Sequence, residues 1–406
     1  MPGSRSAPTL MDVTDKDQAS RRPAVFHFSH HSTGLGHLVR SLAIAGSLAE
    51  GCDVLFVAGG RVPHEMTLPP KVRLVALPAI GTGPNGSLVS FDPRYSLDEA
   101  RKRRRQQLLA SFDEFDPDIV LVELFPFGRR KFASEFLHLL EHSRQGRRRT
   151  VISSVRDLLV DAHPDKQLHD DEAAARLDAY FDAVVVHGDE RFARIEETFR
   201  PSIAPRVPFY STGFVAPATP VRPTVQHDNQ VLVSAGGGLT GAQLLAAAVE
   251  AHRTVLGPLG ASTRVVTGPF LPPESRRAIE ARARGVRGLR LERFVPDLAS
   301  AIAESAVSVS QCGYNTSIDL LRAGVPSVVV PYDEGRETEQ WERAKRLESL
   351  GVVSLLPFAR LSADSLARSV LDAATSTTPP AKLDLDGTAK AASVIVSLAT
   401  APTATS

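Results

Sequence analysis

Residues 307–350 constrain the fold of this 406-residue chain more than any other stretch. A short β-branched run at 307–310 precedes the turn residues Cys312 and Gly313, which are followed by a helical apolar pattern and a second apolar run at 327–330. This order predicts a strand, a glycine turn, a helix and a strand, which together form a parallel βαβ unit. In such a unit the turn lies at the carboxyl edge of the sheet. The free N–H groups of the helix that follows can hold an anion there.

Polar side chains are expected to converge on this turn. They are Asn315 and Thr316 at the start of the helix, Asp319 further along it, and Glu339 and Gln340 after the next strand. Because the carboxyl ends of parallel strands share one edge of the sheet, these groups should face one cleft. Backbone donors suit phosphate, a carboxylate suits a ribose diol, and a Glu–Gln pair suits sugar hydroxyls. The stretch therefore predicts a site for a nucleotide sugar.

Length and composition bound the class of protein. A chain of 406 residues is too long for one core of ordinary size, so we expect two domains. The net charge of +1 provides no global field that would attract nucleic acid. No apolar run approaches the ~20 residues that span a bilayer, and the N-terminus has no apolar signal core. With only Cys52 and Cys312, which we expect to stay reduced, the composition predicts a cytoplasmic protein with at most peripheral membrane contact.

A second series of the same kind opens the chain. Residues 24–29 predict a strand, and a glycine-rich loop with Gly34, Gly36 and His37 leads into a helix. Further strands are predicted at 53–57, 72–77, 119–124, 151–153 and 183–186, with helical patterns at 97–115, 132–140 and 170–181. Strands that alternate with helices predict a mostly parallel, doubly wound sheet.

The predicted fold is therefore α/β, with two Rossmann-like domains that face each other across a cleft. The glycine loop at 236–238 repeats, in the second half, the strand-to-loop start of the first half. The expected order is a disordered N-terminus at 1–22, an acceptor domain at 23–213, a proline-rich linker at 214–229, a donor domain at 230–385, and a final helix and tail at 386–406 that can cross back to the first domain.

Three motifs carry a family resemblance. Gly313-x-x-Thr316-x-x-Asp319, Ala323-Gly-Val-Pro326 and Glu339-Gln340 resemble the donor half of GT-B glycosyltransferases of the family 28 type, which includes the peptidoglycan N-acetylglucosaminyltransferases. The resemblance implies transfer of a hexose-type sugar from a nucleotide-sugar donor, UDP-linked, to an acceptor hydroxyl, without a cofactor. In that family the position of Asp319 is usually Glu, and its carboxylate binds the ribose. Aspartate is one methylene shorter and can serve the same contact.

The resemblance also implies a set of donor contacts. Glycines 236–238 would approach the diphosphate, and the main chain at Val295 would pair with the uracil edge. The implied donor-binding residues are Gly34, Gly36, Gly236, Gly237, Gly238, Val295, Cys312, Gly313, Asn315, Thr316, Asp319, Glu339 and Gln340. The structural alternatives are a tight turn at the glycines and a helix cap at Asp297. No Asp-x-Asp pair follows a strand in the donor half, so we expect no tightly bound metal.

His37 is the candidate catalytic residue. It follows two glycines at a helix N-terminus, and histidine can take a proton from a hydroxyl near neutral pH. Related transferases place the histidine of Gly-x-Gly-His in the cleft. The candidates on the acceptor side, which follow three strands at the same sheet edge, are Arg129, Arg156, Asp157 and Asp189. Glu123, Asp157 and Asp189 are the alternatives if His37 is not the base; Arg156–Asp157 could equally be an internal ion pair and Asp189 a helix cap.

Two other functions remain open from the sequence. Gly34-x-Gly-His37-x-x-Arg40 is also similar to the opening of UDP-sugar hydrolases, which use water as the acceptor, although residues 90–210 leave room for a larger acceptor. A non-catalytic protein that binds nucleotide sugars is the third interpretation. For a transferase, the acceptor could be lipid-linked or a secondary metabolite. The basic run at 101–105 would suit an anionic membrane surface in the first case.

Overall fold

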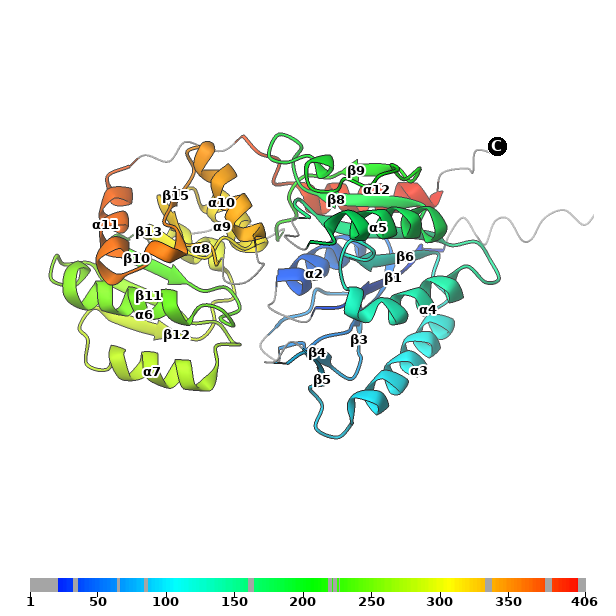
Figure 1. The fold of residues 1–406 in the computed structure, drawn as a ribbon, viewed down its shortest axis with the longest axis horizontal. Helices are drawn as coiled ribbons and strands as arrows, with labels where there is room; N and C mark the ends of the chain where they lie inside the picture. Colours follow the sequence, from blue (N-terminus) through cyan, green and yellow to red (C-terminus); the bar gives the residue numbers. More distant parts are fainter. Residues whose placement is uncertain are drawn as a thin grey trace, which may run out of the picture.

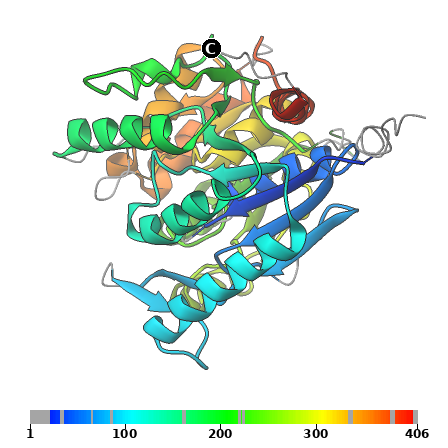
Figure 2. The same ribbon diagram turned by 90° about the vertical axis from the view of Figure 1, so that its right-hand side faces the viewer.

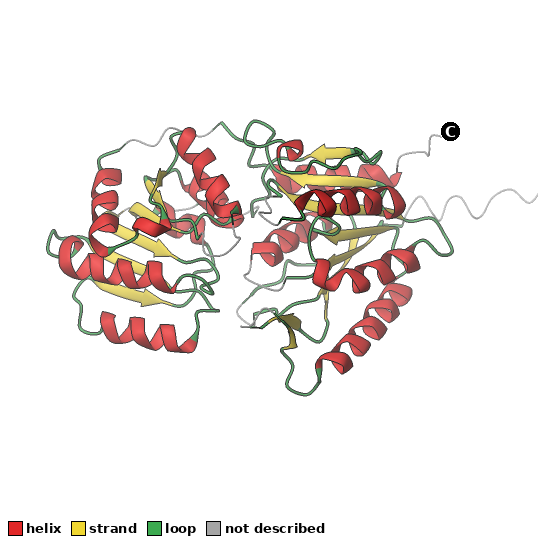
Figure 3. Ribbon diagram, in the orientation of Figure 1, coloured by secondary structure: helices red, strands yellow, loops and turns green. Residues whose placement is uncertain are grey.

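The computed structural model describes residues 21–31, 36–63, 66–83, 87–159, 164–217, 221, 225, 227–332, 338–376 and 382–400. The helices and strands form two lobes, with the first half of the chain on the right in Figure 1 and most of the second half on the left. Figure 3 shows that each lobe has strands in its centre and helices outside. The expected α/β class with parallel sheets is confirmed.

The first lobe is built on a seven-stranded sheet with the order β3-β2-β1-β6-β7-β8-β9. Every neighbouring pair in it is parallel. The strands are β1 (Ala24–Ser29), β2 (Asp53–Ala58), β3 (Val72–Ala76), β6 (Ile119–Glu123), β7 (Thr150–Arg156), β8 (Ala183–His187) and β9 (Phe209–Ser211). The central strands are buried on both faces, which explains their nearly continuous apolar sequences.

Helices cover both faces of this sheet. They are α2 (Gly36–Leu48), α3 (Leu97–Phe115), α4 (Ala133–Ser143) and α5 (Lys166–Tyr180), with short 3-10 turns η1 (Arg130–Phe132) and η2 (Ile195–Glu197). Helices α3, α4 and α5 pack on the face that carries Phe26 and Phe28, whereas α2 packs on the face that carries Val25. Ser96 begins α3 with a capping box, because its side chain accepts from Glu99 N and the Glu99 carboxylate accepts from Ser96 N.

The second lobe repeats the plan with a six-stranded parallel sheet of order β12-β11-β10-β13-β14-β15. Its strands are β10 (His227–Ser234), β11 (Ser262–Val266), β12 (Leu289–Glu292), β13 (Ser305–Ser310), β14 (Ser327–Val329) and β15 (Ser354–Leu355). Its helices are α6 (Ala242–Ala251), η3 (His252–Leu256), α7 (Pro273–Ala283), α8 (Leu298–Ala303), α9 (Tyr314–Ala323), α10 (Glu339–Ser349), η4 (Phe358–Arg360) and α11 (Ala363–Ala374).

The last helix, α12 (Gly387–Thr400), returns to the first lobe. Ala391 and Ile395 are fully buried in the cluster that also contains Val25 and Leu38 of the first lobe. In Figure 2 the red helix is seen end-on at the edge of the first lobe, where α12 packs against α2 and β8. A second apolar cluster spans the two lobes and joins Phe192 and Phe214 to Tyr314.

The structure also departs from the sequence-based expectations. Arg22 was expected to belong to a disordered N-terminus, but it is held in place: its Nη2 donates to the carbonyl oxygens of Ala49 (2.6 Å) and Cys52 (2.7 Å). An antiparallel hairpin of β4 (Ile80–Thr82) and β5 (Leu88–Ser90) was not predicted, because three-residue strands are too short to show a period. Residues 1–20 and 401–406 lie outside the described part of the chain. Over the described ranges, no helix is both long enough and apolar enough to cross a membrane.

Candidate active site

A cleft of about 590 Å³ opens between the carboxyl edges of the two sheets. The first lobe lines it with the start of α2, the segment that follows β6 and the last residue of β7. The second lobe lines it with the loops after β10, β12 and β13. Predicted site residues that line it are Gly36, His37, Arg129 and Arg156 on one side and Gly236, Gly237, Gly238, Val295, Gly313, Asn315, Thr316, Asp319, Glu339 and Gln340 on the other. Gly34 lies outside the described residues.

Three predicted site residues do not line the cleft. Cys312 is fully buried, and burial raises its pKa to about 11. Asp157 is buried in an ion pair with Arg343 (2.7 Å), so it contacts the cleft only through that arginine, which also pairs with Glu339. Asp189 accepts from the backbone N–H of Arg191 (2.9 Å) and of Asp384 (2.7 Å), which fixes a turn and the segment leading to α12. Both residues have structural contacts, but not the predicted ones: Asp157 pairs with Arg343 in place of Arg156, and Asp189 caps a turn in place of a helix.

The glycine turns of the two lobes meet across the cleft. Gly313 precedes the first residue of α9, and Asn315 Nδ2 donates to the carbonyl oxygen of Gly36 (3.0 Å). In the second lobe, Gly238 has φ +89°, and a Cβ there would lie 2.3 Å from the Thr267 carbonyl oxygen. Only glycine fits this close approach, and the N–H of Gly238 donates to the Ala235 carbonyl oxygen (2.9 Å), which closes the turn.

Asp319 faces the cleft from α9 and is only 16% exposed. Burial raises the pKa of its carboxyl to about 7; Asp297 raises it further, and Arg322, 3.9 Å away, opposes the shift. Asp297 accepts from Ser300 N (3.1 Å), so its predicted role as a helix cap is confirmed. The Asp319 carboxyl therefore gains or loses its proton close to neutral pH.

His37 is held by Glu123, the last residue of β6. The distance from His37 Nδ1 to Glu123 Oε1 is 2.6 Å, and the Glu123 side chain is fully buried. Because a carboxylate accepts, this contact assigns the proton to Nδ1 and the lone pair to Nε2. Arg156 Nη1 approaches Nε2 at 3.4 Å. The sequence offered Glu123 as an alternative to His37, whereas the structure makes the two residues partners.

The surroundings keep His37 neutral. Burial lowers the pKa of His37 to about 3; Glu123 opposes this shift, and Arg129 and Arg156 add to it. Burial alone would raise the pKa of Glu123, but His37, Arg40 and Arg129 hold that pKa well below its ordinary value. The pair therefore combines an ionised carboxylate with a neutral imidazole, which is the form that accepts a proton.

A chain of buried ion pairs closes the floor of the cleft and joins the lobes. Arg156 pairs with Glu339 across the cleft, Glu339 Oε1 lies 2.7 Å from Arg343 Nη2, and Arg343 pairs with Asp157. Gln340 Oε1 accepts from the backbone N–H of Cys312 (3.2 Å) and Tyr332 (3.1 Å), which orients its amide. The predicted Glu–Gln pair is therefore present, with its carboxylate shared between two arginines.

Arg40, the last residue of the glycine–histidine motif, also contacts the His37–Glu123 pair. Its Nη2 donates to Glu123 Oε1 (2.5 Å), and its guanidinium lies 5.0 Å from the centre of the Tyr314 ring. The signal in the sequence was the spacing of three residues from His37, which places both side chains on one side of a helix.

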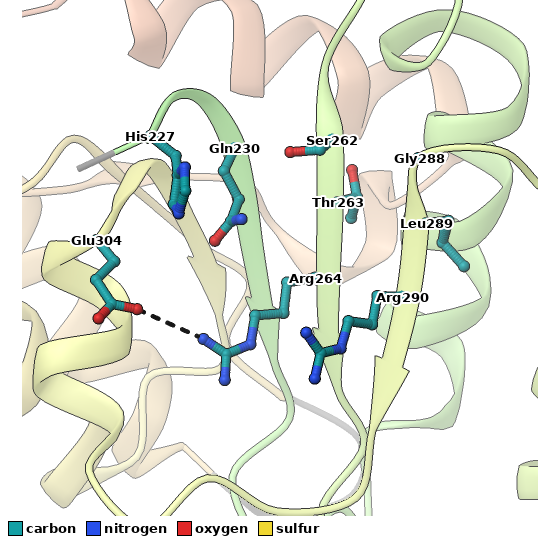
Figure 4. A pocket seen from close by; sticks show the side chains of 9 residues that line it. All are labelled: His227, Gln230, Ser262, Thr263, Arg264, Gly288, Leu289, Arg290 and Glu304. Atoms are coloured by element: carbon teal, nitrogen blue, oxygen red, sulfur yellow. Dashed lines mark ion pairs between the residues drawn. The ribbon is translucent and has the colours of Figure 1, made fainter. Parts of the chain in front are cut away.

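A second pocket, of about 500 Å³, lies near the amino ends of β10, β11 and β12 (Figure 4). Arg264 points toward Glu304 there, with 3.8 Å between Nη1 and Oε2. Arg264 Nη2 also lies 2.8 Å from Glu292 Oε2, and Arg290 pairs with the other oxygen of that carboxylate (2.9 Å). Its charges are already paired within the sheet, so the cleft is the stronger candidate site.

The family described as glycosyltransferase family 28 C-terminal domain matches residues 232–397. The likeness to this family thus covers the second lobe and most of α12. The chain is 29% identical over 169 residues to the UDP-N-acetylglucosamine--N-acetylmuramyl-(pentapeptide) pyrophosphoryl-undecaprenol N-acetylglucosamine transferase of Agrobacterium fabrum, covering 39% of this chain and 44% of the relative. It is 30% identical over 199 residues to the transferase of that name from a Chelativorans species (43% and 52%). The chain thus spans about half the length of these relatives.

Solved structures extend the likeness in fold to both domains. The calicheamicin glycosyltransferase CalG4 superposes with a TM-score of 0.55 at 17% identity, over 94% of this chain and 95% of that one. MurG of Acinetobacter baumannii superposes with a TM-score of 0.52 at 17% identity, over 92% and 99%. The chain therefore has the GT-B fold, and the predicted resemblance to the family 28 type is confirmed.

Proposed function

We propose that this protein is a glycosyltransferase that moves a hexose-type sugar from a UDP-linked donor to an acceptor hydroxyl. The observation that carries the proposal is the His37–Glu123 pair, with 2.6 Å between Nδ1 and Oε1, across the cleft from the glycine turns of the family 28 domain. A neutral imidazole oriented by a carboxylate can accept the proton of a hydroxyl.

The donor would lie along the second domain. Backbone N–H groups at Gly236 and Gly237, in the turn that Gly238 closes, and at the start of α9 would receive the diphosphate, since such N–H groups favour anions. Asp319 would accept from the ribose hydroxyls, and the main chain at Val295 would read the base. Gln340 and Glu339 would hold the sugar hydroxyls near His37. We assign UDP as the carrier of the sugar because the names of the two similar transferases begin with UDP-N-acetylglucosamine.

In the reaction, the acceptor oxygen forms a bond to the anomeric carbon as its proton passes to His37 Nε2. The bond from that carbon to the diphosphate oxygen breaks, and the nucleoside diphosphate leaves with the electron pair. Glu123 would stabilise the imidazolium through Nδ1, as the orienting carboxylate does in hydrolytic triads. Arg156 must move from Nε2 to admit the hydroxyl, because its Nη1 lies 3.4 Å away in this structure.

The test measures release of nucleoside diphosphate and formation of glycoside from the intact protein. Donors would be UDP-N-acetylglucosamine, UDP-glucose, UDP-glucuronate and dTDP-glucose, each with and without a panel of phenolic, polyketide and polyprenyl-phosphate acceptors. Transfer that depends on acceptor, and falls with His37→Ala, is the expected result. Release of free sugar at full rate without an acceptor would instead identify a hydrolase, and binding without turnover on every acceptor would indicate a non-catalytic binding protein.

A further inference from the structure

The buried ion pairs at the cleft floor carry more positive than negative charge. The cations are Arg40, Arg129, Arg156 and Arg343, and the anions are Glu123, Asp157 and Glu339. His37 does not change this balance at neutral pH, because its pKa is lowered to about 3, mainly by burial. Buried charge is costly unless it is paired, so the excess cation needs an explanation.

Arg129 is the cation with the weakest partner. Its side chain is only 10% exposed, and its one ion pair within the described residues joins Nη2 to Glu123 Oε2 at 3.6 Å, which is longer than a hydrogen bond. The other oxygen, Oε1, is taken by Arg40 and His37. Among the described residues, Nε and Nη2 of Arg129 are buried without a hydrogen-bond partner.

The backbone around Arg129 indicates that its position is maintained at a cost. Arg129 has φ +62° and Leu124, just after β6, also has φ +62°, a region that side chains other than glycine seldom occupy. Residues held in this region cluster at functional sites, where the surrounding structure compensates for the strain. The segment after β6 thereby brings the guanidinium back into the cleft beside Glu123.

Arg156 supplies a second cation, on the His37 side of the His37–Glu123 pair. It pairs with Glu339 through Nη2, and its Nη1 lies 3.4 Å from His37 Nε2, while its side chain is 21% exposed. Burial lowers the pKa of Arg129; Glu123 opposes that shift and Arg156 adds to it, in accord with two guanidinium groups that lie near each other. Both arginines line the cleft.

We propose that Arg129 and Arg156 form a subsite for an anionic group, a carboxylate or a phosphate, that a substrate carries next to the reacting centre. The inference rests on the proposed function, because it assigns the substrate class for that cleft. Paired guanidinium groups bind planar carboxylates and phosphates through several charged hydrogen bonds. The anion can come from the donor, as the carboxylate of a uronic sugar beside Glu339, or from the acceptor, beside its nucleophilic hydroxyl.

The binding test uses the full chain and needs no turnover. Thermal unfolding with inorganic phosphate, with and without saturating UDP, would be compared for wild type, Arg129→Gln, Arg156→Gln and Arg130→Gln. Arg130 is exposed and does not line the cleft, so Arg130→Gln is the control with the same change of charge. Phosphate should raise the Tm of wild type and of Arg130→Gln, and its apparent affinity should fall about tenfold or more in the other two variants.

Calorimetry with UDP-glucuronate and UDP-glucose distinguishes the two sources of the anion. If the donor supplies it, wild type should bind UDP-glucuronate about tenfold more tightly than UDP-glucose, lose that preference in Arg129→Gln, and lose phosphate binding when UDP-glucuronate is present. If the acceptor supplies it, the two donors should bind equally, and phosphate should still bind the complex with UDP.

Two results together would overturn the subsite. The first is that phosphate does not bind, or binds Arg129→Gln and Arg130→Gln equally; the second is that wild type binds both donors with equal affinity. Failure of the proposed function has a different signature, since the intact protein would then transfer no sugar to any acceptor while Arg129-dependent binding of phosphate persisted.

Discussion

Arg343 of the second domain and Asp157 of the first form a buried ion pair, with 2.7 Å between Nη2 and Oδ1. The two residues are 186 positions apart, and both side chains are at most 1% exposed. Arg343 also holds Glu339, which lines the cleft, so the contact between the domains and the cleft wall share one guanidinium. The relative position of the domains and the geometry of the site are therefore coupled.

Asp157→Asn should destabilise the protein by about 3 kcal/mol, because it leaves a buried guanidinium with one carboxylate in place of two. Urea unfolding would measure the loss. Asp178→Asn, which weakens the surface contact between Asp178 and Arg206 (3.4 Å), is the matched control and should change stability by less than about 1 kcal/mol. An equal, small effect of both substitutions would show that the buried pair does not hold the domains together.

Glu123→Gln should lower turnover by roughly 10²-fold while nucleotide affinity changes little. The amide can still orient Nδ1, but it lacks the charge that stabilises the imidazolium. Steady-state kinetics and calorimetry with UDP would test this, with Glu114→Gln on the exposed side of α3 as the control. Normal turnover in Glu123→Gln would exclude an electrostatic role for this carboxylate.

His37→Ala should lower turnover by ~10²–10⁴-fold, the usual contribution of a positioned general base. UDP affinity should stay nearly unchanged, because most of the proposed donor contacts lie on the other domain. His37→Gln should be no more active if proton transfer is the role, and should recover activity if His37 only positions a substrate. Turnover of His37→Ala close to that of wild type would remove His37 as the base.

Asp319→Ala should weaken UDP binding by about 1–3 kcal/mol, the range for a hydrogen bond with a charged group. Calorimetry would measure it, with Asp364→Ala in the first turn of α11 as a control away from the cleft. Unchanged affinity would mean that the ribose is held elsewhere.

The pKa of Asp319, raised to about 7 mainly by burial, has a consequence for stability. The folded protein keeps this proton at pH values where the unfolded chain has lost it, so the residue lowers stability as pH rises from about 4 to about 7. Asp319→Asn should remove that slope and make the variant more stable than wild type at pH 8, by up to about 4 kcal/mol. Urea unfolding at pH 5 and pH 8 would test it; a difference between variant and wild type that does not change with pH would contradict the raised pKa.

Much of the site was predictable because its parts are local in sequence. The alternation of apolar runs and glycine turns predicts two parallel βα series, and helix periodicity places Asp319 and Thr316 near the turn at Gly313. Close backbone approach requires glycine at 238, where a Cβ would meet the Thr267 carbonyl oxygen. Such features follow from the sterics and hydrogen bonding of neighbouring residues, which a single sequence displays.

The pairings of charged groups were decided only in the tertiary structure. Glu123 meets His37 across 86 positions, and Asp157 meets Arg343 across 186, because parallel strands bring distant segments to one sheet edge. A motif names a charged residue but not its distant partner, so Asp157 and Asp189 were candidates for acceptor contacts until packing placed Arg343 and the Asp384 N–H beside them. Burial, which sets the pKa values of His37 and Asp319, is likewise a property of the packed chain, since desolvation depends on every neighbour that excludes water.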